Sequence, residues 1–134
     1  MFMLTMGPGT NLAYPDICEM YVGESTSPTI CSNTGTSATT SPTAYNVLVD
    51  CMPAINQLSL GLMSSGDESG YLGGMVSAMV DGQTEYIIGC TTILVDGVPA
   101  QRLTSVTGQN CMGVSPNTVG NCLSPSQVTV LTLG

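Results

Sequence analysis

The chain of 134 residues is the size of one domain with a single hydrophobic core, and we expect no fused effector domain within residues 1–134. It carries nine Asp and Glu residues against one Lys or Arg and no His, for a net charge of −8. Because phosphate binding needs several Lys or Arg side chains, this balance excludes nucleic acid and anionic membrane surfaces as partners. General-base and nucleophilic catalysis usually depend on His or Lys, so the composition predicts that the protein is not an enzyme.

The sequence predicts neither a stable membrane anchor nor an export signal. No segment approaches the roughly 18–20 continuous apolar residues of a membrane-spanning helix. The N-terminal run MFMLTMGPG lacks basic residues, and its apolar part is too short for a secretory signal. We therefore expect assembly in the cytoplasm, where the six cysteines would stay reduced or bind metal.

In chain order, the sequence predicts short strands separated by turns and loops, with almost no helix. Residues 1–24 are expected to contain a turn at 14–16 (YPD), and residues 25–43 to form a Ser/Thr-rich loop. The segment SSGDESGYLGG at 64–74 is expected to be a solvated surface loop. The predicted strands are apolar or β-branched runs bounded by Gly, Pro, Asn or Asp: 45–50, 58–63, 75–80, 85–88, 92–95 and 128–133.

One octapeptide recurs within the chain. VLVDCMPA at residues 47–54 returns at 93–100 as ILVDGVPA, with five of the eight positions identical, and a degenerate third copy, QVTVLTLG, occupies 127–134. In the second copy, Asp96 and Gly97 form a pair that two-residue hairpin turns prefer, since Gly adopts positive φ without strain. The sequence therefore predicts an all-β fold of short hairpins and long Gly/Ser/Thr-rich loops with pseudo-threefold symmetry.

Three motifs in order resemble a known family. They are YPDIC at 14–18, SSGDESG at 64–70 with the two glycines that follow, and IGCTTILVDGVPAQRL at 88–103. With these motifs the chain, from about residue 14 to its end, resembles the Tox-PAAR-like branch of PAAR-like proteins, which is associated with bacterial type VI secretion. The resemblance implies a small cone of β-hairpins that caps a spike protein of the valine-glycine-repeat (VgrG) type, sharpens it for membrane puncture and links effectors to it.

The repeats give a physical reason for such a partner. A homotrimeric β-helical spike ends in three open strand edges, and one chain with three related strands can pair with all three, so we expect one tip per trimer. Delivery out of the cell would follow when the spike is fired. Because alternate strand residues share a face, six residues of the repeats are expected to face inward and to support partner binding: Val47, Val49, Ile93, Val95, Val128 and Val130.

The resemblance also implies a metal, because PAAR tips are described as held by a metal on histidines and a cysteine. Since this chain has no His, a structural zinc or iron ion would need thiolate ligands, with carboxylate help. Cys18 lies at the family's Pro-Asp-x-Cys position, and Cys111 in NCMG lies where the family places a ligand-bearing loop. Cys31 and Cys122 follow loops that are likewise rich in Ser, Pro and Asn, and they complete the predicted ligand set. The alternative, in which all six cysteines are structural thiols or disulfides, stays open.

A second class of function also fits the sequence. The chain has the composition of an extracellular, disulfide-bonded, Ser/Thr-rich β adhesin or a phage tail-fibre module. The thiol state and any bound metal separate the two hypotheses, because a cytoplasmic tip keeps free or metal-bound thiols and an exported adhesin forms disulfides.

Overall fold

The computed structural model describes residues 1–41, 44–111, 113 and 115–133, and these confirm the predicted all-β class. The helical content of this described part is a single 3-10 turn, Ser37–Thr39, and no helix in it is long and apolar enough to cross a membrane. The strands are β1 (Thr10–Val22), β2 (Ser25–Thr36), β3 (Thr40–Ser41), β4 (Ala44–Val49), β5 (Met52–Ala54), β6 (Leu60–Gly61), β7 (Ser64–Ser65), β8 (Gly73–Gly74), β9 (Gln83–Ile88), β10 (Cys90–Val95), β11 (Val98–Ala100), β12 (Val106–Cys111) and β13 (Thr118–Ser124).

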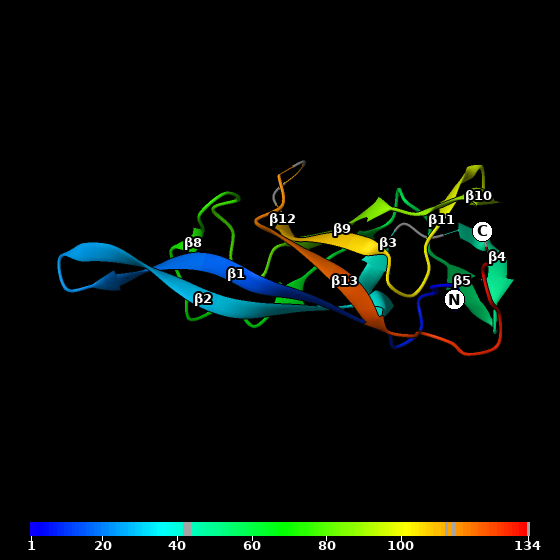
Figure 1. The fold of residues 1–134 in the computed structure, drawn as a ribbon, viewed down its shortest axis with the longest axis horizontal. Coiled ribbons are helices and arrows are strands. Elements are labelled where there is room, and N and C mark those ends of the chain that lie inside the picture. The colour runs from blue at the N-terminus through cyan, green and yellow to red at the C-terminus, as the bar shows by residue number, and fades with distance from the viewer. Residues whose placement is uncertain (42–43, 112, 114, 134) are drawn as a thin grey trace.

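β1 and β2 form a long antiparallel hairpin that projects from one end of an elongated molecule (Figure 1). Two predictions are wrong here. Residues 14–16 lie within β1, at a register shift between Ala13 and Asp16, and most of the segment 25–43 is strand β2. The Ser/Thr-rich segment lacks the apolar alternation of a typical strand, but its backbone groups are satisfied by pairing with β1.

The strands are arranged in one large sheet and two small ones. The large sheet has the order β3-β6-β9-β12-β13-β1-β2-β7, and β8 pairs with β1. The hairpins β4–β5 and β10–β11 form the two small sheets. Both hairpins and both ends of the described chain lie at the end opposite the tip of the β1–β2 hairpin (Figure 1). We call this end the base.

The two base hairpins are the two best copies of the repeat, and they have the same geometry. In each, a two-residue turn has positive φ at both positions, 53° and 65° at Asp50 and Cys51, and 55° and 78° at Asp96 and Gly97. This is the turn that matches the natural twist of a hairpin, and it confirms the turn predicted at residues 96–97. The internal duplication is therefore structural as well as sequential.

The other predicted strands have mixed outcomes. The strand at 85–88 is confirmed within β9, and the segment 58–63 contains only the short strand β6. The prediction for 75–80 is wrong, because Ala78 has a positive φ of 58° and the backbone turns there. Residues 128–133 form no strand but one isolated bridge, at Leu131, for which the partner lies at the other end of the chain.

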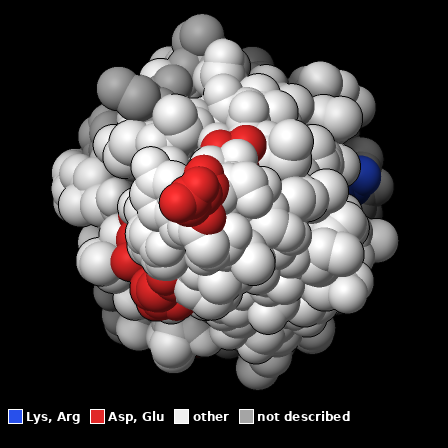
Figure 2. Space-filling model, turned by 90° about the vertical axis from the view of Figure 1, so that its left-hand side faces the viewer, with Lys and Arg blue, Asp and Glu red and all other residues white. Residues whose placement is uncertain are grey.

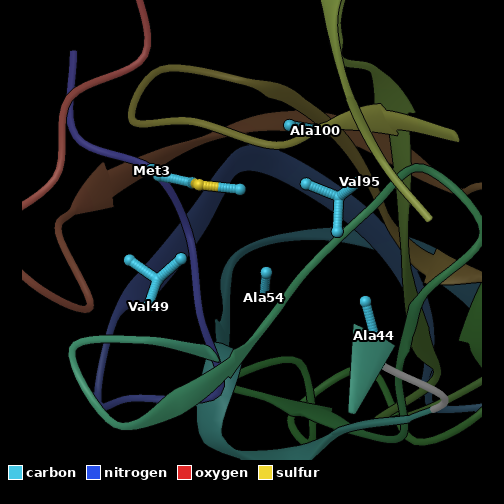
Figure 3. Packing of buried hydrophobic residues seen from close by; sticks show 6 residues of the cluster. All are labelled: Met3, Ala44, Val49, Ala54, Val95 and Ala100. Carbon is cyan, nitrogen blue, oxygen red and sulfur yellow. The ribbon is translucent and has the colours of Figure 1, made fainter. Parts of the chain in front are cut away.

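The core of the base is built from small side chains. Six buried residues point into a common interior (Figure 3): Met3, Ala44, Val49, Ala54, Val95 and Ala100. A second buried cluster contains Leu4, Ile55, Tyr86 and Cys122. Met3 belongs to the first cluster and Leu4 to the second. The N-terminal segment is therefore an integral part of the base.

Candidate functional site

The base consists of three equivalent arms, two of which are the hairpins β4–β5 and β10–β11. The third arm is assembled from both ends of the chain: Phe2 forms an antiparallel bridge with Leu131, and the backbone N–H of Met3 donates to the carbonyl of Val130 at 3.1 Å. The backbone N–H of Thr132 in turn donates to the carbonyl of Met1 at 2.6 Å. The ends of the chain therefore replace the covalent turn of the other two arms.

A ring of three backbone hydrogen bonds joins the arms. Leu4 donates to Gln101, Gln101 donates to Ile55, and Ile55 donates to Leu4, with N···O distances of 2.9, 3.2 and 3.0 Å. All three residues are fully buried. Because each segment donates to one neighbour and accepts from the other, the ring shows that the base has pseudo-threefold symmetry.

Two further sets of contacts repeat around the same ring. Two residues after each ring member, a backbone N–H donates to a carbonyl of the next arm: Met6 to Pro53, Gln57 to Pro99 and Leu103 to Phe2. One residue after each ring member, a backbone N–H donates to a serine hydroxyl: Thr5 to Ser126 at 2.8 Å, Asn56 to Ser59 at 3.3 Å and Arg102 to Ser105 at 3.0 Å. The symmetry thus extends from the ring to the two residues that follow each of its members.

The structure corrects the register of the third repeat. Leu48 lies opposite Pro53 and Leu94 opposite Pro99, whereas Leu131 lies opposite Phe2. Residues 130–132 therefore correspond to 47–49 and 93–95, a shift of three positions from the alignment that starts the third copy at residue 127. The Pro-Ala half of the third copy is provided by the N-terminal residues 2 and 3.

Four of the six residues predicted to face inward do so. Val49 and Val95 are buried, and Val47 and Ile93 pack against the same cluster. The prediction for Val128 is wrong, because its side chain is 68% exposed, and Val130 is also exposed, at 39%. The buried position of the third arm is held by Thr132 instead, as the corrected register requires. The role in partner binding that the sequence predicts for these six residues stays a prediction.

A buried polar cluster lies nearer the projecting hairpin. Asp16 is fully buried, and its carboxylate accepts hydrogen bonds from the side-chain amides of Asn33 at 3.0 Å, Asn110 at 3.4 Å and Asn117. These residues come from β1, β2, β12 and the segment before β13. The amide donors compensate much of the cost of burying a carboxylate, and they tie four segments together.

Asp67 brings a second carboxylate into this cluster, so the prediction of a solvated loop at 64–74 is wrong at its centre. Asp67 is fully buried and accepts the backbone N–H of Asp81 at 3.2 Å, while its neighbour Glu68 is exposed. Burial, together with the side chain of Asp81 and the charge of Asp16, raises the pKa of Asp67 to about 6. Glycines permit the close approach of this loop, since a Cβ at Gly70 would overlap the Cβ of Cys18.

The four cysteines predicted as metal ligands do not come together in one group. Cys18 and Cys31 lie on the paired strands β1 and β2, close enough for the charge of one to raise the pKa of the other. Cys111 ends β12 and donates to the carbonyl of Gly108 at 3.2 Å. Cys122 belongs to the second core cluster. All six cysteines are free thiols, so the structure contains no disulfide.

The cysteines therefore do not fit a four-thiolate zinc or iron site. Among the described residues, two groups have potential ligand atoms within 4.8 Å of one another: Asp16 with Cys18 and Asp67, and Asp67 with Glu68 and Asp81. Burial and the charges of Asp16 and Asp67 raise the pKa of Cys18 to about 12, which favours the thiol over the thiolate that metal binding needs. A bound metal stays a prediction. The first of these groups would offer it one thiol, from Cys18, and the second would offer carboxylates alone.

Sequence reasoning missed the N-terminal part of the base and the polar cluster. Residues 2–4 carry no Pro-Ala motif, and only an alignment of the third copy with both chain ends could have found them. The sequence predicts Asp16 in a turn and Asp67 in a solvated loop, and the structure buries both. The glycines that flank Asp67 at positions 66 and 70 were the available signal for close packing.

A small all-β domain with a pseudo-threefold base at one end and a projecting hairpin at the other is the class that these features define. The sequence model of one family, the toxin PAAR-like domain, matches residues 9–120. The chain belongs to this family. No curated protein and no solved structure matches it.

Proposed function

We propose that this protein is the tip of a bacterial contractile injection system and caps a homotrimeric VgrG-type spike through its base. The observation that carries the proposal is the ring of Leu4, Ile55 and Gln101, around which the three arms repeat. A trimeric β-helix ends in three equivalent strand edges that must be paired or covered. One chain with three equivalent arms matches this symmetry, so one tip serves one trimer.

The projecting hairpin β1–β2 then forms the leading end of the spike. Figure 2 views the molecule from this end and shows carboxylate groups on its surface. Negative charge there disfavours lasting contact with anionic lipid and with nucleic acid, as expected for a tip that crosses a membrane without anchoring in it. In this proposal the tip assembles on the spike in the cytoplasm, links effectors to it and leaves the cell on firing.

Native mass spectrometry tests the proposal. The purified protein is mixed with the trimeric VgrG-type spike of the same gene cluster, and the expected complex contains one tip and three spike chains. A spike truncated before its terminal β-helical turns is the control and should not bind. A complex of three tips with three spike chains, or no complex, contradicts the proposal.

A further inference from the structure

The outer surface of the three arms carries the same apolar side chain at the same structural position. Leu48, Leu94 and Leu131 are 63%, 58% and 54% exposed. Their partners on the opposite strand are Pro53, Pro99 and Phe2 in the same order. Each partner lies two positions before a member of the ring. A single exposed leucine on a surface needs no explanation, but three at symmetry-related positions do.

These leucines are not members of either buried core cluster. In each arm the next residue is the one that packs into the core, and it is buried: Val49, Val95 and Thr132. That buried position varies in chemistry, since two arms have valine and the third has threonine. The exposed position is leucine in all three arms, so the surface is more uniform than the core beneath it.

We infer that Leu48, Leu94 and Leu131 are the anchors by which the base binds a threefold partner, each entering an equivalent apolar pocket on one of its three chains. The inference rests on the proposed function and names the contact surface and the chemistry of the partner. Well-packed apolar anchors at the centre of a contact carry most of the binding energy in protein interfaces. A symmetric trimer offers three identical pockets, and this chain offers three identical side chains to fill them.

The charges beside the anchors further specify the partner. Asp50 and Asp96 are exposed in the turns that follow Leu48 and Leu94, whereas the third arm has the exposed Leu133 at the corresponding position. A pocket that must receive all three arms therefore needs an apolar floor and a Lys or Arg with a long aliphatic stem at its rim. Such a side chain pairs with a carboxylate in two arms and packs its stem against leucine in the third.

Three single variants, Leu48→Asp, Leu94→Asp and Leu131→Asp, test the inference. Their affinities for the purified VgrG-type trimer of the same gene cluster are measured by biolayer interferometry, with circular dichroism to confirm folding. Each variant should bind at least tenfold more weakly than the wild type, and the three losses should agree within about threefold. Ile30→Asp is the matched control, because Ile30 is 62% exposed on the projecting hairpin, and it should bind within twofold of the wild type.

The outcomes separate the inference from the proposed function. If the wild type does not bind one trimer per tip, the proposed function fails. If the wild type binds in that ratio and the leucine variants bind equally well, or only one of the three loses affinity, the inference is overturned. Leucine-to-serine variants at the same positions replace any aspartate variant that does not fold, and the same tenfold criterion applies to them.

Discussion

The backbone N–H of Met3 donates to the carbonyl oxygen of Val130 at 3.1 Å, so two residues from opposite ends of the chain lie side by side in one arm of the base. In the other two arms the corresponding strands are joined by two-residue turns. The two strands of the third arm are held together by non-covalent contacts alone, whereas the strands of each hairpin stay tethered by their turn when they open. It should be the least protected of the three against local opening.

A circular permutant tests this arrangement. Replacing residues 133 and 134 with an Asp-Gly pair that joins Thr132 to Met1 would give the third arm the turn found at Asp96 and Gly97, with new ends opened at Gly23 in the exposed tip of β1–β2. We expect this permutant to fold and to melt several degrees above a permutant with the same new ends and a six-residue Gly/Ser linker, because the shorter closure costs less entropy. Differential scanning calorimetry gives both melting temperatures. Equal values would show that the third arm does not adopt a hairpin geometry.

The core of the base should not accept a charge. Val95→Asp would place a carboxylate among small apolar side chains at a cost of several kcal/mol, and we expect the variant to be unfolded or insoluble at 25 °C. The adjacent Leu94→Asp is the matched control, since Leu94 is exposed and its replacement should leave the circular dichroism spectrum unchanged. A folded Val95→Asp variant would mean that this face is not the core.

Gln101 interrupts an otherwise apolar set of ring residues. Its side chain is fully buried, and neither its Nε2 nor its Oε1 makes a hydrogen bond with the described residues, whereas the equivalent positions are Leu4 and Ile55. A buried amide without partners costs about 1–3 kcal/mol, so Gln101→Leu should raise the free energy of unfolding by about that amount. Chemical denaturation measures it, with Gln101→Ala as the control for lost volume. A Gln101→Leu variant less stable than the wild type would show that the amide has a partner in solution.

Asp67 gives the stability a dependence on pH. The folded state raises the pKa of this carboxyl from its ordinary 3.8 to about 6, so the folded protein binds the proton more tightly than the unfolded chain. The stability contributed by protonated Asp67 is complete below about pH 4 and is lost as the pH rises through 6. Asp67→Asn should therefore be more stable than the wild type at pH 7.5 and close to it at pH 4.

Melting curves at these two pH values measure the effect, and Glu68→Gln is the control because Glu68 is exposed. The Asp67→Asn variant also tests the prediction of a bound metal. If the cluster holds a metal ion through Asp67, the asparagine variant should be less stable at pH 7.5, and metal analysis should show that the wild type carries the ion and the variant does not.

The two hairpins of the base could be predicted from sequence because their determinants are local. The Asp-Gly pair at 96–97 sets the turn, and prolines 53 and 99 mark the same strand position in both copies. The third arm could not be predicted in the same way, since its strands are more than 120 residues apart and no turn connects them. The sequence of residues 128–133 predicts a strand but does not indicate which segment pairs with it.

The long hairpin and the polar cluster depend on tertiary context. β2 has a Ser/Thr-rich sequence without apolar alternation, and pairing with β1 decides its conformation. Asp16 and Asp67 carry no pattern that distinguishes a buried carboxylate from a solvated one. Their burial depends on amide donors from β2, β12 and the segment before β13, which are distant in the sequence.

The ring of Leu4, Ile55 and Gln101 also constrains how the chain folds during synthesis. Each of its hydrogen bonds joins segments about 45 residues or more apart, and the third arm adds residues 130–132. The base therefore cannot close until residue 132 has been made and is free to fold, although the two local hairpins can form earlier. Long-range closure of this kind is slow, so the nascent protein passes through a period in which its apolar arms are accessible to other chains and to chaperones.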